Sequence, residues 1–178
     1  MFANQITCNM SLIDQPFERA LSILTEISIH DLVFVLTAIT FNLLIAGIFI
    51  AQKRERLKLV KTFGIIWLLL AIPLAIVFIN YLIVGRDLWI MICFGFIFFY
   101  ILLELLLDYI LKIDFRQKPI THVPYIIIEY VALFSLIGIS TAIDQTLGYI
   151  VGVSFWILMA SLIYLYWDKI KARKRKID

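Results

Sequence analysis

Long hydrophobic runs separated by short polar segments form the main pattern along the chain. Several of these runs approach or exceed the roughly 18 to 20 residues that an α-helix needs to cross about 30 Å of hydrocarbon. They predict five transmembrane helices, with approximate bounds 32–51, 62–84, 88–111, 123–143 and 147–167. Because almost none of the runs has a polar face, we do not expect them to be core helices of a soluble bundle. The expected fold is therefore all-α, a polytopic membrane bundle of five helices over residues 32–167.

A different pattern precedes the first run. Asp14 and Pro16 are typical of helix starts, and apolar residues then recur on one helical face. That face comprises Phe17, Ala20, Leu21, Leu24 and Ile27. The pattern predicts a short amphipathic helix, at the membrane interface or against the bundle, within an extracytoplasmic segment 1–31. Ser28 and Asp31 follow as a weak capping box for the first span.

Composition and charge fit a chain whose main solvent is lipid. The chain is 63% hydrophobic and only 16% charged, whereas a soluble domain is about half apolar and about a quarter charged. The formal charge of +3 does not indicate nucleic-acid binding, because the basic residues lie in clusters between or after the apolar runs. We therefore expect the lipid bilayer as a partner, and no nucleic acid.

Lys and Arg in the short loops predict the orientation of the bundle, because cytoplasmic loops are enriched in these residues. Fourteen of the sixteen basic residues lie in three segments, 52–61, 112–122 and 169–178. The other two, Arg19 and Arg86, lie in segments predicted on the opposite side. We expect an integral protein of the plasma membrane with its N-terminus outside and a basic cytoplasmic tail, 168–178.

Small residues predict where two of the spans pack. Helices in lipid associate through close backbone approach and polar contacts rather than through the hydrophobic effect. The fourth span carries Gly138-x-x-x-Ala142 and the fifth carries Gly148-x-x-x-Gly152, both near the predicted outer ends. A short turn joins these spans, so we expect close packing there, although small residues are also generally common in membrane helices.

Four ionisable residues recur at a spacing of four near the end of the third span: Glu104, Asp108, Lys112 and Arg116. In an α-helix they cover an arc of about 120° on one face. Lys112 and Arg116 fit the cytoplasmic edge, and Asp108 can form a helical ion pair with Lys112. If Lys112 marks the edge, Glu104 lies roughly 12 Å inside. An ionised acid at that depth costs several kcal/mol unless it is paired, protonated or hydrated.

The fourth span carries a second acid, Glu129, at a similar predicted depth because the two helices are antiparallel. Tyr125, Glu129 and His122 share a face of this span. The candidate site for a ligand or cation therefore comprises Glu104, Asp108, Glu129, Tyr125 and His122. Two carboxylates at close range do not both ionise easily, so Glu104 and Glu129 can share a proton or a cation. The identity of a metal, if one binds, is undefined by the sequence.

Three functional hypotheses follow. In the first, which we favour, the acids bind a cation or proton in a transporter or channel-like protein. In the second, they stabilise a non-catalytic structural or assembly subunit, or pair with a second copy or a membrane partner. In the third, carboxylates hold Mg²⁺ in an enzyme that acts on a lipid-type substrate. Glu-x-x-x-Asp does not match the Asp-x-x-Asp spacing expected of the third.

No cofactor motif is evident. Haem is disfavoured because the two histidines, His30 and His122, are predicted at opposite faces of the membrane and cannot be axial partners. A cavity that reaches Glu104 from the cytoplasmic side would favour transport, whereas tight hydrogen bonds to both acids in a dry interior would favour a structural role.

Overall fold

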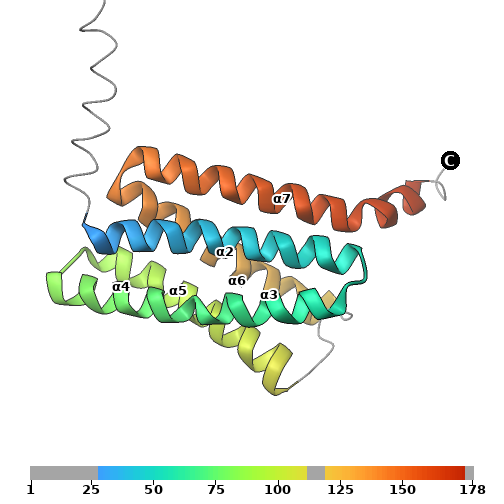
Figure 1. Cartoon of the computed structure of the whole chain (residues 1–178), viewed down its shortest axis with the longest axis horizontal. Helices are drawn as coiled ribbons and strands as arrows, with labels where there is room; N and C mark the ends of the chain where they lie inside the picture. Colours follow the sequence, from blue (N-terminus) through green and yellow to red (C-terminus); the bar gives the residue numbers. More distant parts are fainter. Residues whose placement is uncertain (1–27, 112–118, 175–178) are drawn as a thin grey trace, which may run out of the picture.

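The computed structural model describes residues 28–111 and 119–174, with side chains for 28–107, 110, 111 and 124–167. Helices make up nearly all of these residues, which contain no strand (Figure 1). They are α2 (Ile29–Lys53), α3 (Leu57–Leu69), α4 (Ala71–Val84), α5 (Leu88–Glu104), η1 (Leu105–Ile110), α6 (Pro119–Ile143) and α7 (Gln145–Lys174). The predicted amphipathic helix lies outside the described residues.

Five helical segments of the described chain are long and apolar enough to cross a membrane. They are Ile29–Lys53, Leu57–Val84, Leu88–Leu107, Pro124–Ile143 and Gln145–Trp167. The predicted all-α bundle with five spans is therefore confirmed. Large apolar side chains also cover its outside, including Ile83 (79% exposed) and Trp156 (71%). A surface of this kind suits lipid rather than water, and we conclude that the chain is a membrane protein.

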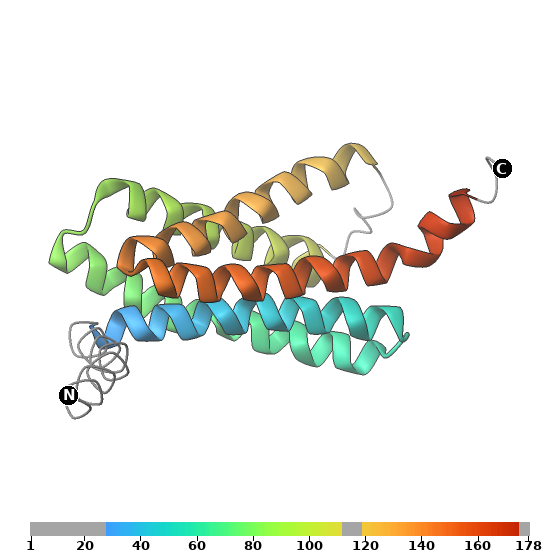
Figure 2. The ribbon, with the colours of Figure 1, turned by 90° about the horizontal axis from the view of Figure 1, so that it is seen from above.

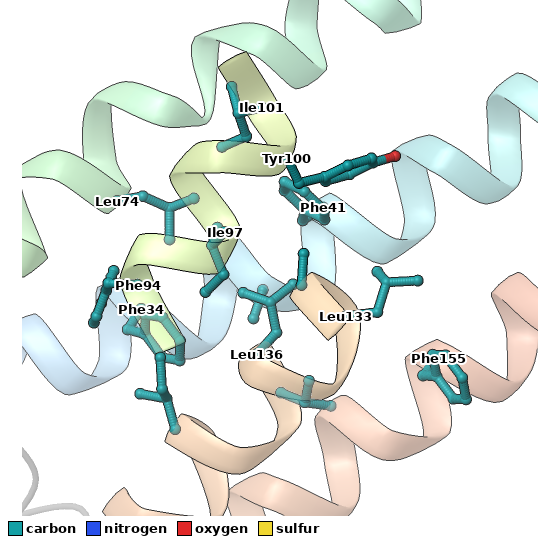
Figure 3. Close-up of a cluster of buried hydrophobic side chains, with 14 of the residues drawn as sticks. Phe34, Phe41, Leu74, Phe94, Ile97, Tyr100, Ile101, Leu133, Leu136 and Phe155 are labelled. Atoms are coloured by element: carbon teal, nitrogen blue, oxygen red, sulfur yellow. The ribbon is translucent and has the colours of Figure 1, made fainter. Parts of the chain in front are cut away.

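Helix α2 lies at the centre of the bundle and packs against α7, α3, α4 and α6 (Figure 1). Its apolar face supplies Phe34 and Phe41 to the core, where Phe34 meets Phe94 of α5 with ring centroids 5.4 Å apart (Figure 3). A polar contact adds to this packing, because Asn42 Nδ2 donates a hydrogen bond of 2.8 Å to Ser154 Oγ of α7. Interhelical hydrogen bonds of this kind hold helices together in lipid.

The second span is interrupted near its middle, where Pro73 lies in the first turn of α4. Proline has no N–H and its ring clashes with the carbonyl four residues before it, which disfavours a continuous helix. Helix α3 accordingly ends at Leu69, and Leu70 N donates to Trp67 O at 3.1 Å, a contact one residue shorter than the α-helical pattern. The interruption leaves α3 and α4 as two segments of one span.

The two ends of the bundle differ. We call the end at residues 54–56, where α2 connects to α3, the basic end, because it carries the basic segment 52–61. Helices α6 and α7 meet at Asp144 at the opposite end and diverge toward the basic end, as Figure 2 shows.

The small residues of α6 and α7 make separate contacts. An ideal Cβ on Gly148 would lie 2.8 Å from Thr141 Cα, so the backbones of α6 and α7 approach closely there. A Cβ on Gly138 would instead meet Trp89 of α5 at 3.9 Å, and one on Gly152 would meet nothing within 4 Å. Ala142 is exposed. The close approach near the outer ends therefore depends on Gly148 and Thr141 rather than on two matched small pairs.

An ion pair with a buried carboxylate lies at the end of the bundle opposite the basic end. Ser28 caps α2 by accepting a hydrogen bond of 3.4 Å from His30 N. Asp31, expected to support this cap, is buried and accepts hydrogen bonds from Tyr81 of α4 and from Arg86 in the α4–α5 turn. Arg86 Nη2 lies 3.2 Å from Asp31 Oδ2. The contact thus connects α2 to α4 and to the turn that follows it.

Candidate functional site

A cavity of about 630 Å³ lies in the half of the bundle nearer the basic end. Residues of α2, α3, α5, α6 and α7 line it, from Ile45 to Gln52 on α2 and from Leu158 to Tyr166 on α7. Both α6 and α7 contribute to its lining, and Figure 2 shows these two helices diverging toward the basic end. Both acids that the sequence singles out, Glu104 and Glu129, are in its wall.

Glu104 is the last residue of α5 and is half-buried. The hydroxyl of Tyr125 on α6 donates a hydrogen bond to Glu104 Oε2. The hydroxyls of Tyr125 and Tyr100 are 3.4 Å apart, so Tyr100, Tyr125 and Glu104 form a hydrogen-bonded series across α5 and α6. Figure 3 shows the Tyr100 ring beside Phe41, with its hydroxyl directed away from the apolar cluster.

Glu129 lies one turn after Tyr125 on α6 and is also half-buried. It lines the same cavity as Tyr100, Tyr125 and Tyr130. The structure therefore brings Glu104, Tyr125 and Glu129 together in one cavity wall. The side chains of the other two predicted site residues, Asp108 and His122, lie outside the described part.

The helix changes form directly after Glu104. Residues Leu105–Ile110 form the π-helix η1, and Leu111 N donates to Leu106 O at 2.8 Å, a five-residue spacing. A π turn contains more residues than an α turn and is often found at functional sites. The predicted common face of Glu104, Asp108, Lys112 and Arg116 assumed α-helical geometry, and this assumption is wrong for η1. Nothing in its residues, LLLDYI, signals the change.

Apart from Tyr125, the aromatic residues of the cavity wall were not predicted as site residues. Trp67, Tyr100 and Tyr130 line the cavity, and the ring centroids of Trp67 and Tyr100 are 5.5 Å apart in an edge-to-face arrangement. Trp67 is only 3% exposed, and its Nε1–H has no acceptor among the described residues. Trp67 and Tyr100 lie within predicted spans, away from the membrane interfaces where aromatic residues act as anchors. This position is the sequence signal that could have identified them as site residues.

Most polar groups of the wall come from two helices, although Gln52 of α2 and Tyr166 of α7 also line the cavity. Helices α5 and α6 supply both carboxyl groups and the hydroxyls of Tyr100, Tyr125 and Tyr130, whereas α2 and α7 supply mainly aliphatic side chains. Carboxylates in an apolar environment attract cations strongly because the low dielectric screens them little. Within the described part of the chain, no group of three or more His, Cys, Asp or Glu side chains is arranged to hold a metal ion.

Comparison of the chain with protein-family models, with curated proteins and with solved structures found no significant match. The fold class is shared by proteins of many activities, so function is inferred from the cavity itself.

Proposed function

We propose that this membrane protein binds a cation or a proton at Glu104 and Glu129, as part of a transporter or channel-like activity. The observation that carries the proposal is the presence of both carboxyl groups in the wall of one cavity of about 630 Å³. A purely structural pair of acids does not require space around it. A ligand-binding pair does, and sites for small ligands are usually preformed cavities with a few convergent polar groups.

The charges in the wall support a cation rather than an anion. Glu104 and Glu129 are the charged residues that line the cavity, as far as the structure describes it. The Tyr125 hydroxyl stabilises the Glu104 carboxylate by a hydrogen bond but brings no positive charge. A bound cation, or a proton, offsets the cost of ionised acids within a membrane span.

The hydrogen bond between Tyr125 and Glu104 favours a second candidate function, that of a structural or assembly subunit. In that case, the acid fixes the arrangement of α5 and α6 and has no ligand. The two functions differ in their response to ions, which the following experiment measures.

We expect the wild-type protein to gain thermal stability with at least one of Na⁺, K⁺, Mg²⁺ or protons, and Glu104→Gln and Glu129→Gln to lose that gain. Glutamine keeps the shape of the side chain and can still accept the Tyr125 hydrogen bond, but it carries no charge. The measurement is the Tm of each protein in detergent across pH and across the three salts at equal ionic strength.

Glu55→Gln is the matched control, because Glu55 is exposed in the α2–α3 connection and the substitution removes the same charge outside the cavity. It should respond to ions as the wild type does. Identical responses in all four proteins would contradict cation binding. A lower Tm in Glu104→Gln, with no ion response in any protein, would support the structural function instead.

We further propose that the N-terminus is outside and the C-terminus is in the cytoplasm of a plasma membrane. The support is the distribution of Lys and Arg, fourteen of which lie in segments at one side of the predicted bundle. The cavity then lies in the cytoplasmic half of the membrane, because it is nearer the basic end.

Cysteine labelling tests this orientation. In a background without Cys8 and Cys93, Leu88→Cys should react with a membrane-impermeant maleimide in intact cells, because Leu88 is 76% exposed at the α4–α5 turn. Lys58→Cys, exposed at the basic end, should react only after permeabilisation. The reverse pattern would overturn the proposed orientation.

A further inference from the structure

The cavity has a far larger volume than an inorganic ion occupies. Sites for small organic ligands occupy about 300 to 1,000 Å³, and the volume of about 630 Å³ is within that range. A water molecule takes up only about 30 Å³ of liquid. A bare metal cation between Glu104 and Glu129 would therefore leave most of the cavity for other atoms.

The division of the wall indicates which other atoms fit. One part, from α5 and α6, carries the two carboxyl groups and three tyrosine hydroxyls. The other part, from α2 and α7, is mainly aliphatic and includes Ile45, Phe49, Leu158 and Leu162. A ligand that matches both parts has a positively charged group at one end and an apolar body at the other.

Aromatic rings lie beside the carboxyl groups. The rings of Tyr100 and Tyr125 have centroids 5.9 Å apart, and Trp67 packs against Tyr100. Ammonium groups bind to the faces of such rings by cation–π interaction, and clusters of aromatic residues recognise quaternary ammonium ligands in this way. An ammonium group near Glu104 and Glu129 would have both opposite charge and aromatic faces within reach.

Trp67 adds a buried polar group to the residues of the cavity wall. Its Nε1–H is a buried donor without an acceptor among the described residues, and Trp67 is in the cavity wall. A buried donor without a partner is uncommon in native proteins and costs stability.

We infer that the cavity binds an organic ammonium compound, with its cationic group at Glu104 and Glu129 and its apolar body against α2 and α7. The inference rests on the proposed cation binding and specifies the class of cation. The main ligand is then the organic cation, and an inorganic ion or a proton can still bind the same two carboxyl groups in its absence.

The test compares benzyltrimethylammonium with neopentylbenzene, its neutral carbon isostere, and with KCl, each added to the wild-type protein in lipid nanodiscs. The ammonium compound should bind and raise the Tm more than KCl does at equal ionic strength. The neutral isostere should not raise the Tm. Because the ligand pair differs only in charge, this comparison requires no variant to fold.

Variants then locate the binding. Glu104→Gln and Glu129→Gln should each weaken the affinity for benzyltrimethylammonium about 10- to 100-fold, the range for a lost interaction with a charged group. Tyr130→Leu should weaken it about 2- to 30-fold through loss of a ring. Tyr130→Phe keeps the ring and loses only the hydroxyl bonded to Met159 Sδ, so it should weaken the affinity less than Tyr130→Leu does.

The outcomes separate this inference from the proposed function. Equal binding of the neutral isostere would overturn the inference, since charge would then play no part. Stabilisation by K⁺, Na⁺, Mg²⁺ or protons that depends on Glu104, without binding of the ammonium compound, would overturn the inference and leave the proposed function standing. No response to any cation, organic or inorganic, or to pH would contradict both.

Discussion

Replacement of Arg86 by leucine should lower the free energy of unfolding by about 1 to 3 kcal/mol, between the effect of losing an exposed ion pair and that of breaking a buried one. The Asp31 carboxylate has a side chain that is only 6% exposed, and Arg86 Nη2 lies 3.2 Å and 3.3 Å from its two oxygens. Without Arg86, the carboxylate stays buried with the Tyr81 hydroxyl as a donor but no cation. Because the Arg86 side chain is 36% exposed, the expected loss of stability is smaller than for an ion pair buried on both sides.

Two further variants test the physical cause. Arg86→Lys keeps the charge but loses the planar guanidinium, which lies 5.1 Å from the centroid of the Tyr81 ring, so it should lose less than Arg86→Leu. In the double variant Asp31→Asn/Arg86→Leu, no buried charge is left unpaired, and part of the stability should return. The free energies come from unfolding in mixed micelles. A loss of less than about 0.5 kcal/mol in Arg86→Leu would show that the pair contributes no more than an ordinary surface contact.

The second large effect is expected at Gly148, where alanine should destabilise the bundle by about 1 to 3 kcal/mol. The added Cβ would lie 2.8 Å from Thr141 Cα, which is closer than van der Waals contact allows. Because the opposing atom belongs to the backbone, a rotation of a side chain cannot relieve the clash. Helices α6 and α7 must instead move apart where they now approach most closely.

Gly152→Ala is the matched control on the same helix. A Cβ at Gly152 would meet nothing within 4 Å, and alanine is the better helix former by about 1 kcal/mol in water. The two substitutions should therefore have opposite signs, with Gly152→Ala neutral or stabilising. Equal effects on the Tm would mean that helix propensity, rather than the contact between α6 and α7, governs both positions.

The number and approximate bounds of the spans could be predicted because a backbone in lipid has few alternatives to the α-helix. A backbone in hydrocarbon must satisfy its hydrogen bonds within a helix, so each apolar run of sufficient length predicts a span. The sequence predicted five such spans, and five helical segments of the described residues are long and apolar enough to cross a membrane. The interruption between α3 and α4 was not predicted, although Pro73 in the first turn of α4 explains it.

The depth of the two candidate acids also follows from the sequence, because depth in a membrane helix depends only on the rise per residue and on chain direction. That reasoning placed Glu104 and Glu129 in the same half of the bundle, and both are in the wall of one cavity in that half. Rotation about the helix axis could not be predicted in the same way. The face that Glu104 shares with residues after it depends on η1, which has no signal in the sequence.

Only the tertiary structure decided which side chains of different helices contact one another. The sequence by itself determined a five-span helical membrane bundle, the clustering of basic residues and the acids at Glu104 and Glu129. The cavity, the rings of Trp67 and Tyr100 in its wall, and the pairing of Asp31 with Arg86 depend on how the helices diverge and rotate. In a chain that is apolar on nearly every face, those rotations are set by packing, and hydrophobic pattern carries no information about them.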